Sequence, residues 1–225
     1  DGADAGNYVI TQPTTTASIS RRTLTVTGIT ASSKTYDGNT SATSILNVSG
    51  ATLQGIQNSD PIVLSTASAT GTFANKNQGS GKTIQIAGLV ISGTNASNYD
   101  LVQPTTSGTI TRKALGIVGI VATNKVYDAS TSATSLLDTT NAAFDGKVTG
   151  DNLSFSTASI AGSFADKNIG TAKTITITGI TVSGTDADNY TFTQPTLTAN
   201  ITSKTLTITG TTASNKVYDR TVTAT

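Results

Sequence analysis

Residues 174–179 read Thr174-Ile175-Thr176-Ile177-Thr178-Gly179, a strict alternation of hydroxyl and aliphatic side chains. Successive side chains of a β-strand point to opposite faces, so this pattern buries the isoleucines and leaves the threonines in water. The stretch Thr23-Leu24-Thr25-Val26-Thr27 alternates in the same way and is also followed by a glycine. After each glycine the apolar phase slips by one residue, which predicts a β-bulge or a strand bend at Gly28 and Gly179.

The composition of the chain also favours strands. Thr is the most frequent of its 225 residues, and the chain contains no Glu and no Met. β-Branched Thr prefers strands, whereas Glu and Met are among the good helix formers. We therefore predict a mostly β protein.

Charge, the length of apolar runs and the lack of cysteine each exclude a class of partner or site. The net charge is +1, charged residues make up 12% of the chain, and no run of Lys or Arg exceeds two residues. A nucleic-acid partner requires a basic face, so none is expected. The apolar runs are only a few residues long, so we expect no membrane insertion. The absence of Cys excludes disulfides and thiolate metal sites.

A long internal repeat defines the organisation of the chain. The pattern Lys-x-Tyr-Asp occurs with its tyrosine at Tyr36, Tyr127 and Tyr218, each 91 residues after the last (127 − 36 and 218 − 127). The Asn-Tyr pairs and the Gln-Pro pairs recur at the same spacing. Such a unit is long enough for a small domain with its own core. We predict the C-terminal part of a preceding repeat at 1–21, repeat domains at 22–112 and 113–203, and the N-terminal part of a following repeat at 204–225.

The joint between the two full copies carries no flexible linker. Residues 108–117 contain neither a Pro-rich nor a Gly/Ser-rich stretch, and Ile110 and Leu115 both fit strand-like alternation. A strand leaving one domain is therefore expected to pass almost directly into the next domain's first strand. We predict elongated domains arranged end to end as a rod.

Shorter signals mark the other elements of a copy. Strands are expected at 61–65 and 99–103 and at the matching 152–156 and 190–194. The polar stretches 92–98 and 183–189 are typical of hairpin turns. The stretch 41–46 is ambiguous between a short helix and a strand.

The repeated Lys-x-Tyr-Asp cluster has two interpretations. Lys34, Tyr36 and Asp37 are side chains that enzymes use for proton transfer, but a relay also needs a cofactor or substrate pocket. The structural interpretation is a turn that ends a strand, in which Asp37 bonds to its own backbone and Tyr36 buries its ring. Gly38 suits a left-handed turn position, although Ala129 and Arg220 replace it in the other copies. We favour the turn.

Other chemistry stays open as minor alternatives. The acidic loops 1–7 and 185–189 offer oxygen ligands for calcium, but the middle copy loses the carboxylates, so a solvated loop tip is the default. Rows of Thr-x-Thr can bind ice, but the repeat here is as long as a domain. A Lys-to-Asn isopeptide crosslink is permitted by residues that recur in both copies, with Asp37 as its acid: Lys34, Lys76, Asn77 and Asn98.

Catalysis is poorly served by this sequence. The chain has no His, Cys or Glu, and nothing groups its Ser, Lys and Asp residues with a pocket. We predict that the protein is not an enzyme, with no catalytic, cofactor-binding or metal-binding residues and no cofactor.

An ordered set of motifs resembles a known family. The motifs are Lys125-Val126-Tyr127-Asp128, the stretch 164–170, the stretch 173–184 and the loop ending at Tyr190. They are similar to the YDG/MBG tandem repeat domains of large bacterial filamentous-haemagglutinin-like, two-partner-secretion surface adhesins. The resemblance covers the whole chain and implies a β-grasp-like domain, with a small β-sandwich as the alternative. It brings no catalytic residues.

The resemblance and the repeat together suggest a structural role. We expect a stalk or spacer segment of an exported bacterial adhesin that supports cell adhesion or biofilm formation, located at the bacterial cell surface or secreted. The expected partners are neighbouring repeats of the same chain. The alternative is a binding module whose tandem domains recognise a polysaccharide, a host or bacterial surface, or another adhesin copy.

Overall fold

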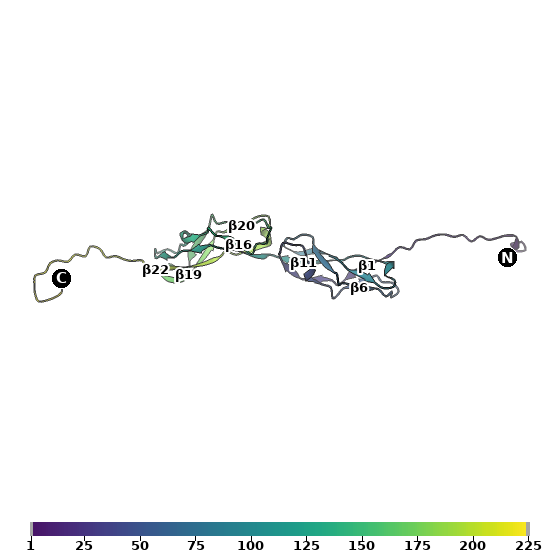
Figure 1. Cartoon of the computed structure of the whole chain (residues 1–225), viewed down its shortest axis with the longest axis horizontal. Helices are drawn as coiled ribbons and strands as arrows, with labels where there is room; N and C mark the ends of the chain where they lie inside the picture. Colours follow the sequence, from purple (N-terminus) through teal and green to yellow (C-terminus); the bar gives the residue numbers. More distant parts are fainter. Residues whose placement is uncertain (1, 224–225) are drawn as a thin grey trace. The chain divides into compact units, whose positions relative to one another are not determined.

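The structure is a computed structural model that describes residues 2–223 (Figure 1). The chain divides into two compact units, and the division falls between Arg112 and Lys113. Within the described residues the regular elements are β-strands and single-turn 3-10 helices, with no α-helix. The predicted mostly β fold is confirmed. No helix in this part of the chain is long and apolar enough to cross a membrane.

Both units contain the same succession of short strands. In the first unit these are β1 (Arg22–Thr27), β2 (Thr30–Ala31), β3 (Ser33–Thr35), β4 (Leu46–Asn47), β5 (Thr52–Gln54), β6 (Val63–Ser65), β7 (Thr70–Phe73), β8 (Gly79–Ala87), β9 (Val90–Ser92), β10 (Tyr99–Leu101) and β11 (Thr105–Thr111), with η1 (Ala5–Asn7), η2 (Thr43–Ile45) and η3 (Ala96–Asn98). In the second unit they are β12 (Lys113–Val118), β13 (Val121–Ala122), β14 (Lys125–Val126), β15 (Leu137–Asp138), β16 (Ala143–Asp145), β17 (Ser154–Ser156), β18 (Ala161–Phe164), β19 (Gly170–Thr178), β20 (Thr181–Ser183), β21 (Tyr190–Phe192) and β22 (Thr196–Thr202), with η4 (Thr134–Leu136) and η5 (Ala187–Asn189).

The strands pair in the same way in both units. The first unit forms sheets with the orders β10-β1-β5 and β3-β11-β8-β7, together with the pairs β2-β4 and β6-β9. The second unit repeats this pattern as β16-β12-β21 and β14-β22-β19-β18, together with β13-β15 and β17-β20. The first strands pair with the last strands in parallel, and the other strand pairs are antiparallel.

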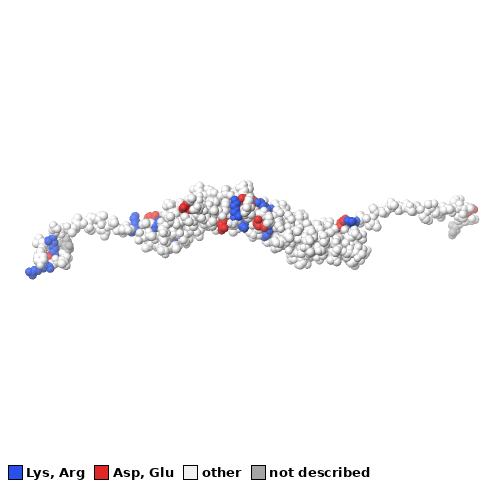
Figure 2. Space-filling view, in the orientation of Figure 1, with Lys and Arg blue, Asp and Glu red and all other residues white. Residues whose placement is uncertain are grey.

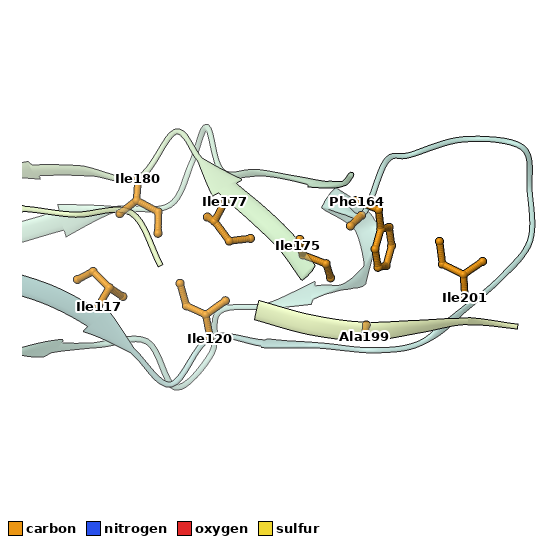
Figure 3. Close-up of a cluster of buried hydrophobic side chains, with 9 residues drawn as sticks. Ile117, Ile120, Phe164, Ile175, Ile177, Ile180, Ala199 and Ile201 are labelled. Atoms are coloured by element: carbon orange, nitrogen blue, oxygen red, sulfur yellow. The ribbon is translucent and has the colours of Figure 1, made fainter. Parts of the chain in front are cut away.

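A hydrophobic core lies between the paired strands of each unit. In the second unit Ile117 and Ile120, from the first strand and the turn after it, face Ile177 and Ile180 across the interior (Figure 3). Ile175 is fully buried in the same cluster. The alternation in residues 174–179 is therefore confirmed, because its isoleucines point inward while its threonines remain exposed.

The two glycines at the phase slips mark bends between strands. Gly28 has a φ of +84° and lies between β1 and β2, and Gly179 has a φ of +82° and lies between β19 and β20. A Cβ on Gly28 would lie only 1.9 Å from the carbonyl oxygen of Gly50, so this position also requires glycine for space. The predicted strand bends are confirmed. The register shifts lie elsewhere, in β11 between Gly108 and Ile110 and in β19 between Gly170 and Lys173.

The structure resolves one ambiguous prediction about local elements and contradicts another. The ambiguous stretch 41–46 contains η2 and then begins β4. The stretches 92–98 and 183–189 are turns, but the predicted hairpins are wrong because the flanking strands belong to different sheets. β9 pairs with β6, whereas β10 pairs with β1. A single 3-10 turn before Tyr99 redirects the chain from one sheet to the other.

The chain outside the two copies has little regular structure. Residues 8–21 and 203–219 form neither helix nor strand. By the 91-residue offset they correspond to strands whose partners in a complete copy are not in this sequence. Unpaired strand residues gain no ladder hydrogen bonds and bury little surface, so they are not held in a sheet.

Candidate functional site

The Lys-x-Tyr-Asp cluster follows the first strands of each copy. Lys34 lies in β3, and Tyr36 and Asp37 come directly after this strand. In the second copy Lys125 opens β14 and occupies the same place. The cluster therefore forms the end of a strand, as the structural interpretation expected.

The lysine ammonium is the centre of a closed turn. Lys34 Nζ lies 2.8 Å from Asp37 Oδ1 and donates to Asn39 Oδ1 at 3.0 Å. It also donates to the main-chain carbonyl oxygens of Asn39 at 3.1 Å and Ser41 at 2.9 Å. The side chain of Lys34 is only 9% exposed, so the charge is largely enclosed by these oxygens. We call this arrangement the lysine ring.

The lysine ring recurs in the other two copies of the motif. Lys125 Nζ lies 2.8 Å from Asp128 Oδ1 and donates to the carbonyl oxygens of Ser130 and Ser132, both at 3.0 Å. Lys216 bonds to Asp219, to the hydroxyl of Thr221 and to the carbonyl oxygen of Thr223. The third ring forms in a segment without regular strands, so the contacts needed for it lie within eight consecutive residues.

Hydrogen bonds lower the pKa of the aspartate in each cluster. Partial burial raises the pKa of Asp37, but hydrogen bonds from Lys34 and from the Asn39 N–H outweigh it, so this pKa lies below its usual value. In the second copy the hydrogen bond from Lys125 lowers the pKa of Asp128 to about 2. Both carboxylates stay ionised near neutral pH and hold the ammonium, an arrangement that suits structure rather than proton transfer.

The tyrosine of the cluster ties the turn to the last strand. The Tyr36 N–H donates to the carbonyl oxygen of Thr111 at 2.8 Å, and Tyr127 makes the same bond to Thr202 at 2.9 Å. Tyr36 is almost fully buried, with 1% of the residue's surface exposed. Behind the lysine ring, Lys34 Nζ lies 5.9 Å from the centre of the Phe73 ring, within the range of a cation–π contact.

The residue after the aspartate adopts a left-handed conformation in every copy. Gly38 has a φ of +80°, Ala129 of +66° and Arg220 of +63°. The predicted left-handed turn position is therefore confirmed. A side chain at such a φ is strained, so Ala129 and Arg220 keep the turn at a conformational cost that Gly38 avoids.

A second repeated tyrosine cluster was missed by sequence reasoning. Tyr190 Oη donates to Asp151 Oδ2 at 2.6 Å and accepts the Val148 N–H at 2.9 Å. Tyr99 makes the corresponding bonds in the first copy, to Asp60 at 2.7 Å and from Gln57 at 3.1 Å. Asp60 and Asp151 share the 91-residue spacing, and that spacing was the signal available in the sequence. Each cluster fastens the loop before β6 or β17 to the start of the last strands.

The acidic loop considered for calcium uses its carboxylate within the protein. Asp186 Oδ2 accepts the Asn152 N–H at 2.9 Å, and the matching Asn95 donates to Asp60 at 2.8 Å. Within residues 2–223 no group of three or more His, Cys, Asp or Glu side chains could hold a metal ion.

Lys34 contacts the side-chain amide of Asn39, a residue outside the set that would form the isopeptide crosslink. Lys34 Nζ donates a hydrogen bond to the Asn39 oxygen, and an ionised Asp37 has no proton to act as the acid. The crosslink stays a minor alternative that intact mass tests, since each bond releases one ammonia.

A mainly apolar hollow lies beside Tyr127, the tyrosine of the Lys-x-Tyr-Asp cluster in the second copy. It has a volume of about 410 Å³ and is lined by Tyr127, Asn168, Ile169, Ser203, Lys204 and Leu206. Neither Lys125 nor Asp128 lines it, so this hollow does not gather the three side chains of the cluster.

Comparisons with known proteins agree with the repeat. The family model of the YDG domain matches residues 20–107 and 111–198. Searches of curated proteins and of solved structures found no significant match. The lysine rings at Lys34 and Lys125 both lie within the matched residues. The chain belongs to the YDG domain family and carries two tandem copies of the domain.

Proposed function

We propose that the two YDG domains are a stalk or spacer segment of an exported bacterial surface adhesin of the filamentous-haemagglutinin, two-partner-secretion type. Such a segment holds a distal binding domain away from the cell and so supports adhesion or biofilm formation. In this proposal the segment's partners are the neighbouring repeats of the same chain, at the cell surface or in a secreted protein.

The observation that carries the proposal is the strand-to-strand joint. β11 ends at Thr111 and β12 begins at Lys113, so Arg112 alone lies outside a strand. We infer that a joint this short, with few rotatable bonds, limits bending between successive domains, which is what a spacer requires. Each copy also has its own core and its own set of sheets, so further copies add length without altering the existing ones.

The surface chemistry of the copies supports an inert spacer. The face shown in Figure 2 is mostly uncharged, and the charged atoms occur in small mixed groups. Among the described residues the large, exposed aromatic side chains are Tyr8 and Tyr218, and both lie outside the two copies. In the part of the chain that the structure describes, neither copy therefore has a strongly exposed aromatic ring on which a sugar could stack. For this reason we prefer the spacer to the binding module.

Solution scattering tests this proposal. The first strands of a copy span 14 residues, 22–35, which corresponds to about 40 Å at ~3.3 Å per residue with one bend. A rod of two copies is then expected to reach about 80 Å before its terminal segments are added. A compact particle in which the copies fold onto each other would contradict the proposal.

A further inference from the structure

The first and last segments of each copy run side by side in the same direction. β1 pairs in parallel with β10, with Arg22 opposite Tyr99, and β3 pairs in parallel with β11, with Thr35 opposite Thr111. Residues 22–35 therefore lie along residues 99–111 over nearly their whole length. Because both pairings are parallel, the copy's first strand residue and its last lie at opposite ends of this double strand.

Hydrogen bonds join the two segments along their length. The Val102 N–H donates to the carbonyl oxygen of Leu24 at 3.0 Å near one end. In the middle the Thr106 hydroxyl donates to the carbonyl oxygen of Ile29 at 3.1 Å. At the other end the Tyr36 N–H donates to Thr111 O at 2.8 Å. Leu24 and Ile110 are buried, which keeps water from competing for the neighbouring bonds.

The second copy repeats this arrangement. Lys113 lies opposite Tyr190 and Lys125 opposite Ile201, both in parallel registers. The Tyr127 N–H again donates to the carbonyl oxygen of Thr202. The parallel pairing is therefore part of the repeated domain and not a local feature of one copy.

This geometry determines how a pulling force acts on a copy. Force applied through the chain pulls the start of the first segment and the end of the last segment apart along the double strand. The hydrogen bonds between the two segments are then perpendicular to the direction of pulling. They carry the force together, because the segments cannot separate from one end with the bonds breaking in sequence. We propose that each YDG copy is a force-bearing element whose parallel terminal segments act as a shear clamp.

The lysine ring gives the repeated cluster a role in this clamp. Lys34 lies opposite Ile110 in the register of β3 and β11, and its ammonium fixes the turn that follows β3. The ring thereby holds the end of β3 in place against Thr111, where the last strand leaves the domain. We infer that the motif secures the end of the clamp at which tension enters from the following repeat.

The inference rests on the proposed spacer function, because a spacer carries tension when its distal end is bound. The two are nevertheless separable. If scattering shows a rod but the domains unfold at low force, the clamp alone is refuted. A compact particle in scattering would refute the spacer, whatever the force measurement shows.

Optical tweezers test the clamp by pulling the same copy through two alternative pairs of attachment points. The chain has no cysteine, so single cysteines introduce unique handles. In the full chain, Arg112→Cys and a C-terminal handle load the second copy along its clamp. Ala129→Cys and the same C-terminal handle load it across the end of β14 and β22, so that their bonds open one after another. Residue 129 is exposed and already carries a side chain at positive φ, so the cysteine is tolerated there.

The two geometries predict different rupture forces for the same domain. At one loading rate, the handle at residue 112 is expected to give a force several-fold higher than the handle at residue 129. The released chain confirms which structure has opened, because residues 113–202 extend to roughly 300 Å and residues 129–202 to roughly 250 Å. Equal forces in the two geometries would overturn the proposal.

A variant of the lysine ring tests its role in the clamp. Lys125→Met removes the ammonium while keeping a side chain of similar length, and it is expected to lower the force in the clamp geometry. Lys216→Met, in the segment outside both copies, is the matched control and leaves that force unchanged. A Lys125→Met force equal to that of the parent chain would refute the role given to the ring.

Discussion

Replacing Ala129 by glycine measures the conformational cost of the turn in the second copy. Ala129 has a φ of +66°, whereas the first copy has Gly38 at a φ of +80° in the same position. A non-glycine residue in the left-handed region costs about 1–2 kcal/mol. Glycine removes that cost but loses about 0.5–1 kcal/mol through its greater freedom in the unfolded chain. The net expectation for Ala129→Gly is a stabilisation of about 0.5–1 kcal/mol.

Differential scanning calorimetry of the full chain is the assay for this substitution. A change of about 1 kcal/mol shifts the Tm of a domain of this size by about 4–8 °C, so Ala129→Gly is expected to raise the transition of the second copy by about 2–8 °C. Gly38→Ala is the reciprocal variant and is expected to lower the transition of the first copy. The unaltered copy is the internal control in each case. A second-copy Tm that falls or stays constant with Ala129→Gly would refute the strain argument.

Three further predictions concern the second copy, two on its lysine ring and one on the bond between Tyr190 and Asp151. Lys125→Met is expected to destabilise the second copy by about 2–3 kcal/mol in chemical unfolding, because it leaves two carbonyl oxygens without their charged donor; an unchanged midpoint would contradict this. Tyr190→Phe removes the hydroxyl bonded to the buried Asp151, so we expect a loss of about 1–3 kcal/mol in the same assay, and a neutral result would show that the bond adds no net stability. The folded-state pKa of Asp128 is about 2, below its usual 3.8, so its contribution to stability is present above pH ~4 and is lost as the pH falls from about 4 to about 2. Melting curves across this range are expected to show a smaller acid-induced fall in Tm for Asp128→Asn than for the parent chain, and equal falls would contradict the assignment.

The local elements of the fold could be predicted because their signals are short-range. Alternation places Ile175 and Ile177 in the core, and the phase slip at Gly179 identifies a bend. The lysine ring closes within eight residues, so the cluster could be interpreted as a turn from its sequence alone. These features depend on the chain's own neighbours and need no knowledge of distant partners.

The pairing between distant segments could not be predicted from the pattern. Nothing in residues 92–98 indicates that β9 and β10 join different sheets, and the hairpin expected there is wrong for that reason. The parallel register of Arg22 with Tyr99 also spans almost the whole copy. The bond between Tyr190 and Asp151 joins two residues that the alternation of side chains does not relate. The one signal in the sequence is that Tyr99 and Asp60 recur 91 residues later as Tyr190 and Asp151.

A distance measurement between equivalent sites tests the spacer account most directly. Ala67 and Ala158 occupy matching exposed turns, 91 residues apart (158 − 67), and cysteines at both positions accept spin labels without competition. If the proposed spacer function holds, pulsed electron–electron double resonance is expected to give one narrow distribution of label distances centred at about one domain length, roughly 40 Å. A broad distribution, or a distance well below one domain length, would contradict a stiff stalk.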